Sequence, residues 1–259
     1  MSISPPLQAL LAALMTWALT AAGAALVLLL RRPRPATLDA MLALGAGVML
    51  AASYFSLLAP GIELAVSLGQ MPFIMAALGF MSGGLMLMAA DALLSRHMSH
   101  LRFTGEHRRT TLLIASITLH NIPEGLAIGV AFGAAALSAD AAALTGAWML
   151  ALGVGLQNMP EGAAVSLPLH RDGMRRSHAF FWGQASALVE PVSALVGALL
   201  ALHVQPMLPF ALAFAAGAMV SVVIGELVPE SQRSPAASVM TLFTMMGFTL
   251  MMILDVALG

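Results

Sequence analysis

Long apolar stretches, separated by short polar segments, dominate the chain from end to end. A helix needs about 20 apolar residues to cross a hydrocarbon layer roughly 30 Å thick. By that measure the sequence predicts eight membrane-spanning helices, at residues 7–30, 38–60, 71–94, 111–136, 142–169, 179–203, 207–228 and 235–258. The stretches lack the polar stripe of a soluble helix bundle and the short alternating segments of a membrane β-barrel. We therefore expect an all-α integral membrane protein, an eight-helix bundle in which residues 1–259 form a single transmembrane domain.

The positive charges follow a regular pattern along these predicted helices. All 11 basic residues are Arg, and they lie in alternate connections, at residues 31–34, 96–109, 171–176 and 233. Cytoplasmic loops of membrane proteins carry the excess of Lys and Arg. The pattern therefore predicts that these connections are cytoplasmic, among them a loop over residues 95–110, and that both chain termini are extracytoplasmic.

The amino-acid composition further limits the class of protein and the kinds of site that the chain can form. Hydrophobic residues make up 60% of the chain and charged residues 9%, with a mean hydropathy of +0.93. A soluble domain carries about 25% charged residues, so lipid must cover most of this surface. The absence of cysteine excludes disulfides, thiolate metal sites and thiol catalysis. A formal net charge of −1 gives no indication of a nucleic-acid partner, and we expect none.

Four glutamates interrupt the apolar stretches. Glu124, Glu161 and Glu190 fall well inside predicted spans, and Glu226 lies near the end of one. A charge at the bilayer centre costs roughly 2.5–3.5 kcal/mol on insertion scales, so several together cost on the order of 10 kcal/mol. A chain retains such groups when they face one another, water or a bound cation. A buried polar network that only locks the helices together is the alternative interpretation.

Two consecutive predicted helices carry the same six-residue frame. It is His-Asn-Ile-Pro-Glu-Gly at 120–125 and Gln-Asn-Met-Pro-Glu-Gly at 157–162. In each frame the first and fifth residues lie one helical turn apart on one face, which the Asn flanks. Two facing helices can therefore direct several polar side chains to a common centre. These candidate ligands are His120, Asn121, Glu124, Gln157, Asn158 and Glu161.

Prolines accompany the acidic residues. Pro123 and Pro160 lack a backbone N–H and crowd the preceding turn, so we expect both helices to kink there. Carbonyls freed by a kink can line a cavity at membrane depth. Glu190 precedes Pro191 in the next span, and Pro229 lies beside Glu230. An acidic residue beside a proline thus recurs in four predicted helices.

The donor set favours a borderline divalent cation. One imidazole with carboxylate and amide oxygens suits Zn²⁺, Cd²⁺, Fe²⁺ or Mn²⁺. Met49 offers one soft thioether, although most of the 20 methionines must serve packing. Without metal, three neighbouring carboxylates cannot all stay ionised, so we expect metal to replace protons as it binds. The metal is then a transported substrate, with no prosthetic group expected.

These motifs together resemble the Zrt/Irt-like (ZIP) family of metal transporters, in its bacterial branch. The paired frames are the most specific feature. Residues 46–53 (Ala-Gly-Val-Met-Leu-Ala-Ala-Ser), Glu190-Pro191 and the run from Glu226 to Glu230 are supporting matches. The resemblance covers nearly the whole chain, from the start of the second predicted helix to the C-terminus.

The resemblance implies a binuclear metal site at the centre of the bundle. One metal position takes side chains from four helices, at Met49, His120, Glu124, Gln157, Glu161 and Glu190. The neighbouring position takes Asn121, Asn158 and the three shared glutamates. Some relatives have Asp in place of Asn158, so the second position carries one negative charge fewer here.

The resemblance also implies a homodimer in the bacterial cytoplasmic (inner) membrane and metal flux toward the cytoplasm. Transport is expected to proceed by alternating access, as a helix group carrying the site slides against a static group. Alternatives from other classes are an intramembrane metal-dependent enzyme and a proton-coupled organic-solute carrier. An enzyme is disfavoured because the sequence has no His-Glu-x-x-His pair.

Outside this centre, a few polar residues are candidates for the path of the metal. The loop histidines His97, His100 and His107 are candidates for collecting metal that leaves, or are incidental residues of a basic loop. Glu226 and Glu230 are candidates for the exit path. Asp39 is a candidate gate residue, although its place near a helix N-terminus is favourable in any case.

Overall fold

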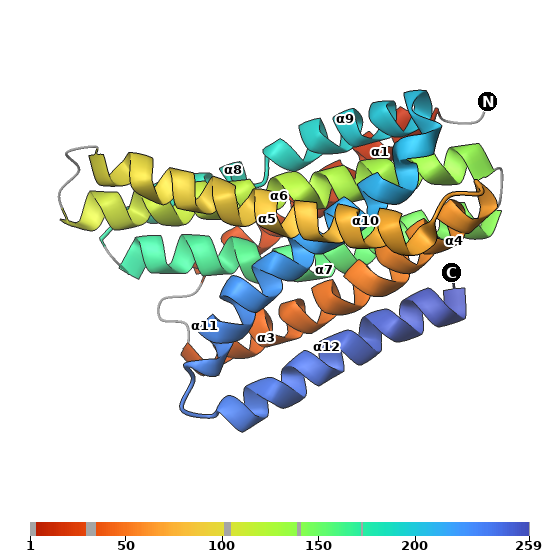
Figure 1. Cartoon of the computed structure of the whole chain (residues 1–259). Helices are drawn as coiled ribbons and strands as arrows, with labels where there is room; N and C mark the ends of the chain where they lie inside the picture. The colour runs from red at the N-terminus through yellow and green to blue at the C-terminus, as the bar shows by residue number, and fades with distance from the viewer. Residues whose placement is uncertain (1–3, 30–34, 101–104, 139–140, 172, 259) are drawn as a thin grey trace.

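The computed structural model describes residues 4–29, 35–100, 105–138, 141–171 and 173–258; within these ranges the side chains at 35, 95, 97–100, 105–113, 116, 120, 141 and 258 are not described. All regular elements of this part of the chain are helices, which lie side by side as an elongated bundle (Figure 1). The expected all-α fold is therefore confirmed. The elements are α1 (Pro5–Ala24), α2 (Leu26–Leu29), α3 (Pro35–Ala52), η1 (Ser53–Leu58), α4 (Ala59–Ser67), α5 (Pro72–His100), α6 (Gly105–Ser138), α7 (Ala141–Arg171), α8 (Arg176–Ala185), α9 (Val189–His203), η2 (Gln205–Met207), α10 (Leu208–Val222), η3 (Val223–Leu227), α11 (Val228–Gln232) and α12 (Ala237–Leu258).

Seven helical stretches among the described residues are long and apolar enough to cross a membrane. They are Pro5–Leu29, Ala36–Ser67, Pro72–Leu94, Ile117–Ser138, Arg176–His203, Gln205–Gln232 and Ala237–Ala257. Each coincides with one of the eight predicted spans. The chain is thus an integral membrane protein.

The remaining predicted span corresponds to α7, which does not belong to these seven. At 31 residues α7 is long enough, but it carries Gln157, Asn158 and Glu161, which lower its mean hydropathy. All three side chains are buried inside the bundle. The polarity of α7 is therefore directed toward protein and not toward lipid.

The helices begin or end differently from the prediction at three places, two of which lie at chain connections. The second span continues past Pro60 to Ser67, because the π-helix η1 precedes this proline and lets it begin a new α-helix. The same arrangement recurs where η3 precedes Pro229. In the predicted loop 95–110, α5 continues to His100 and α6 already begins at Gly105.

The third difference concerns the backbone near Glu190. The sequence predicts one helix over 179–203, whereas the structure divides it into α8 and α9 with turns at 186–188. Pro191 has no N–H to donate, and Glu190 N–H instead donates to Ala187 O at 3.0 Å. By contrast, α6 and α7 stay helical through Pro123 and Pro160.

The helices pack as two groups. In the glutamate group (α1, α6, α7, α8 and α9), α6 packs most extensively on α9, and α1 on α7. In the flanking group (α3, α4, α5, α10, α11 and α12), α10 packs most extensively on α5, and α12 on α3. The groups meet chiefly where α3 lies against α7 and α10 against α6.

Glycines bring the helices of each group into backbone contact. A Cβ on Gly129 of α6 would lie 2.0 Å from Ala194 O of α9, and one on Gly47 of α3 would lie 1.9 Å from Thr244 O of α12. At the boundary between the groups, Gly45 and Gly153 meet the side chains of Gln157 and Met251 instead. Within each group, glycines therefore let the backbones of two helices approach more closely than any larger residue would allow. At the boundary, Gly45 and Gly153 face side chains of the other group.

Candidate metal centre

The carboxylates of the glutamate group are buried where α1, α6, α7 and α9 pack together. Glu124 of α6 and Glu190 of α9 are fully buried, and Glu161 of α7 is 7% exposed. The three are close enough for their negative charges to repel one another. The structure thus brings together the three glutamates that the sequence places inside spans.

A chain of hydrogen bonds connects two of these glutamates through the amides of α7. Gln157 Nε2 donates to Glu124 Oε1 at 2.8 Å and to Asn158 Oδ1 at 2.6 Å. Asn158 Nδ2 donates in turn to Glu190 Oε1 at 2.9 Å. The first two polar residues of the second frame therefore lie between the carboxylates, and amide N–H groups supply the donors that buried carboxylates need.

Three buried oxygens of this cluster have no hydrogen-bond donor among the described residues. They are Asn121 Oδ1, Glu124 Oε2 and Gln157 Oε1. A buried acceptor without a donor is costly, and native structures contain few. A divalent cation is an electron-pair acceptor that carboxylate and amide oxygens of this kind can coordinate, and it also offsets the repulsion among the carboxylates. The donor set therefore fits a metal ion.

His120 is the residue of the first frame whose side chain lies outside the described part. Its backbone belongs to α6, one turn before Glu124. Among the side chains that are described, no three His, Asp or Glu residues form a group that could hold a metal ion by themselves. The amides of Gln157 and Asn158 separate Glu124 from Glu190, so the cluster is one of mixed carboxylates and amides.

Met49 lies on the flanking side of this cluster. It is almost fully buried in α3, one helical turn after Gly45. A Cβ on Gly45 would lie 3.5 Å from Gln157 Cβ, so this face of α3 contacts α7 at the second frame. Met49 therefore occupies the part of α3 that is directed at the cluster.

Asn121 connects the first frame to the backbone break. Its Nδ2 donates to Ser186 O at 3.0 Å, at the turn between α8 and α9. A helix end leaves carbonyls without an intrahelical partner, and the Asn121 amide satisfies one of them. The side chain thereby holds the start of α9, and with it Glu190, against α6.

One polar residue of the cluster, Thr16 of α1, is not among the candidates predicted from the sequence. Its Oγ1 donates to Glu190 Oε2 at 2.5 Å, and the residue is fully buried. The available signal was the pair of threonines Thr16 and Thr20, one turn apart in an otherwise apolar helix. Because threonine is common in membrane helices, this pair alone does not indicate a site.

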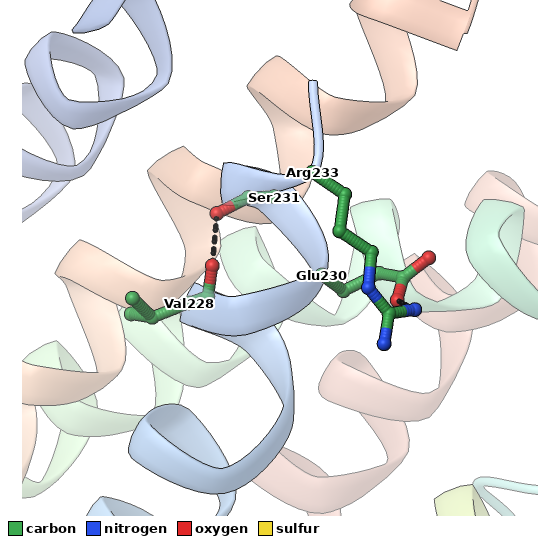
Figure 2. Close-up of polar contacts among 4 residues, drawn as sticks. All are labelled: Val228, Glu230, Ser231 and Arg233. Atoms are coloured by element: carbon green, nitrogen blue, oxygen red, sulfur yellow. Dashed lines mark hydrogen bonds and ion pairs between the residues drawn. The ribbon is translucent and has the colours of Figure 1, made fainter. Parts of the chain in front are cut away.

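The predicted exit residues lie apart from the cluster. Glu226 is half-buried in η3, which packs mainly on α10, α11 and α3. Glu230 is exposed on α11, where Arg233 Nη1 donates to its Oε2 at 2.5 Å (Figure 2). Nearby, Ser231 Oγ donates to Val228 O at 3.0 Å. An exposed ion pair of this kind contributes about 0–1 kcal/mol.

The other predicted residues lie at the helix ends or outside the described side chains. Asp39 is half-buried in the second turn of α3. The side chains of His97, His100 and His107 lie outside the described residues, although their backbones belong to α5 and α6.

Comparison with known proteins agrees with this chemistry. Residues 102–255 match the model of the family described as ZIP Zinc transporter. The chain is 38% identical to Zinc transporter ZIP11 of Xenopus tropicalis, over 99% of this chain and 98% of that protein. It is 36% identical to Zinc transporter ZIP11 of Homo sapiens, over 97% of each chain. It is 38% identical to Zinc transporter ZIPB of Bordetella bronchiseptica, over 94% of this chain and 79% of that protein. With relatives in both vertebrates and bacteria, and with its paired polar frames facing each other in a buried cluster, the chain belongs to the ZIP family of zinc transporters.

Proposed function

We propose that the protein carries Zn²⁺, and with it Cd²⁺, Fe²⁺ or Mn²⁺, toward the cytoplasm through the buried cluster of the glutamate group. Transport of divalent metal is the common activity of the family, whose members are transporters and not enzymes. The observation that carries the specific site is the set of three donorless oxygens, Asn121 Oδ1, Glu124 Oε2 and Gln157 Oε1.

The proposed site is binuclear, as the resemblance implies. The first metal is held by Met49, His120, Glu124, Gln157, Glu161 and Glu190, and the second by Asn121, Asn158 and the shared glutamates. Burial of these residues among α3, α6, α7 and α9 supports the assignment for those whose side chains are described. Gln157 Oε1 has no donor among the described residues, so it can coordinate metal while Nε2 still donates to Glu124. Asn158 Oδ1 accepts from Gln157 Nε2 and has a second lone pair for a metal.

We propose alternating access by movement of the glutamate group along the flanking group. Glycine contacts hold each group together from within, as at Gly129 and Gly47, and a body that moves as a unit needs such contacts. At the boundary Gly45 has ordinary contact with Gln157 Cβ, at 3.5 Å. Side chains at such a boundary can exchange partners without a change in the internal packing of either group.

We further propose eight spans, with α7 as the eighth, and both termini on the extracytoplasmic side. The start of α1 and the end of α12 lie at the same end of the bundle, as an even number of crossings requires (Figure 1). The alternation of arginines supports the orientation. In this arrangement Asp39 is the proposed gate, and Glu226, Glu230, His97, His100 and His107 lie on the proposed exit side.

We propose that the protein forms a homodimer in a bacterial cytoplasmic membrane. The spans Pro72–Leu94 and Ala237–Ala257 are the least buried of the seven, each with 17% of its window inside the structure. They offer an extended apolar surface to lipid or to a second subunit.

The decisive experiment is metal uptake into proteoliposomes with a fluorescent indicator inside. Wild type and Glu161→Ala are compared for Zn²⁺, Cd²⁺, Fe²⁺ and Mn²⁺. Saturable uptake that disappears in the variant supports a carrier that uses this cluster, and the rates rank the metals. Wild-type protein that binds these metals but moves none of them would contradict the proposed transport.

A further inference from the structure

Helix α1 contributes a hydroxyl group to the buried carboxylates. Thr16 Oγ1 lies 2.5 Å from Glu190 Oε2 and 2.9 Å from the carbonyl oxygen of Ala13. A hydroxyl has a single proton, so it can donate to only one of these two acceptors at a time. A hydroxyl donates to an ionised carboxylate and accepts from a protonated one. In either state of Glu190 the Thr16 hydroxyl forms a short hydrogen bond with its Oε2, which fixes the orientation of the carboxyl group.

Glu190 depends on such contacts because its backbone lies at a discontinuity. It is the second residue of α9, directly after the turns at 186–188 and directly before Pro191. Side-chain donors bind both of its carboxylate oxygens, Thr16 from α1 at Oε2 and Asn158 from α7 at Oε1. The orientation of this carboxylate is thus determined by two other helices.

We infer that Thr16 is a positioning residue of the metal site, which holds the Glu190 carboxylate in the orientation that receives the metal. This inference rests on the proposed function. It extends the site to α1, which lies outside residues 102–255 that match the family model. Removal of partners that orient a metal ligand typically weakens metal affinity by about 10–100-fold.

The chain offers a matched control on the same helix. Thr20 lies one turn after Thr16 and is 2% exposed, and its Oγ1 donates at 3.3 Å to the backbone carbonyl of Thr16. Thr16→Val and Thr20→Val therefore remove the same group from equally buried positions. The difference is that only Thr16 donates to a carboxylate of the cluster.

The test measures zinc uptake by proteoliposomes and zinc binding by purified protein for Thr16→Val, Thr16→Ser and Thr20→Val. We expect Thr16→Val to raise the KM and the Kd for zinc by about 10–100-fold. Thr16→Ser keeps the hydroxyl and should stay within about threefold of wild type, and Thr20→Val within about twofold. If Thr16→Val does not fold, Thr16→Ala and Thr20→Ala provide the same comparison.

Two results would overturn the inference. One is zinc affinity of Thr16→Val that equals that of Thr20→Val. The other is failure of Thr16→Ser to restore affinity, which would assign the effect to packing of the methyl group. Glu161→Ala is measured in parallel: if it abolishes uptake while Thr16→Val does not impair binding, only the role of Thr16 fails. If Glu161→Ala transports normally, the proposed function itself fails.

Discussion

The two helix groups treat acidic residues in opposite ways. In the glutamate group, Glu124, Glu161 and Glu190 are buried at the meeting point of α6, α7 and α9. In the flanking group, Asp39 and Asp255 lie close to helix ends, half-buried, and Glu230 is exposed on α11. Both groups are otherwise apolar helices with glycine contacts, so the difference does not lie in how the helices pack.

The two groups also differ in how many helices supply hydrogen-bond donors to their acidic residues. Glu190 has donors from α1 and α7, and Glu124 has one from Gln157. Asp255 receives one hydrogen bond, from Ser56 at 2.8 Å. Several helices of the glutamate group therefore contribute polar side chains to one centre, whereas the flanking group contributes mainly apolar side chains beside it.

The largest effect is expected from a charge removed at the centre. Glu124→Gln keeps the shape of the side chain but deletes a charged ligand, so zinc uptake should fall by at least about 100-fold. Asp255→Asn, in the flanking group, makes the same chemical change away from the cluster and should stay within about threefold of wild type. Initial uptake rates in proteoliposomes measure both, and equal losses would remove the distinction between the groups.

The next effect concerns movement at the boundary. A Cβ on Gly153 of α7 would lie close to the Met251 side chain of α12. Because the chain has no cysteine, Gly153→Cys with Met251→Cys creates a single disulfide across the boundary. We expect its formation to reduce uptake by about tenfold or more, and a reducing agent to restore uptake.

The matched control is a disulfide within the flanking group. A Cβ on Gly61 would lie 3.2 Å from Leu212 Cβ, so Gly61→Cys with Leu212→Cys joins α4 to α10. Uptake should persist with this bond formed. Uptake that also persists with the boundary disulfide formed would contradict the sliding of one group on the other.

Acidification is expected to weaken zinc binding by the glutamate group. Protons and metal compete for the same carboxylates, so zinc affinity should fall as the pH falls from 8 to 5, by about tenfold. Titration of purified protein with zinc at several pH values measures this dependence. A flat affinity over the whole range would contradict proton displacement.

A smaller effect separates the interior of each group from the boundary. Gly129→Ala and Gly47→Ala place a methyl group against a backbone carbonyl, so each should lower the free energy of unfolding by about 1–3 kcal/mol. A methyl group at Gly45 would lie at an ordinary 3.5 Å from Gln157 Cβ, so Gly45→Ala should change the free energy of unfolding by less than about 1 kcal/mol. Thermal unfolding in detergent ranks the three, and equal destabilisation would show that the boundary is as tightly packed as the group interiors.

Several features of this protein follow from the sequence alone. The length and hydropathy of the apolar stretches predict the helices, since a bilayer forces backbone groups to bond within each span. The repeated frames at 120–125 and 157–162 predict which residues form the polar centre, because residues one turn apart share a face. Burial of charge in a span is costly, which predicts that Glu124, Glu161 and Glu190 face one another, water or a bound cation.

Other features depended on the tertiary structure. Prolines accompany the break at 186–188 and the π turns, at Pro191, Pro60 and Pro229, but α6 and α7 stay helical through theirs, so a proline alone does not predict such a change. The contact of Thr16 with Glu190 has no local signature. At the break and at Glu190 the neighbouring helix supplies the partner: Asn121 satisfies the carbonyl of Ser186, and α1 brings a hydroxyl to α9. The sequence by itself determines which groups must be buried together. Only packing decides which helix supplies the partner, because a hydrogen bond between side chains 174 positions apart leaves no trace in local periodicity.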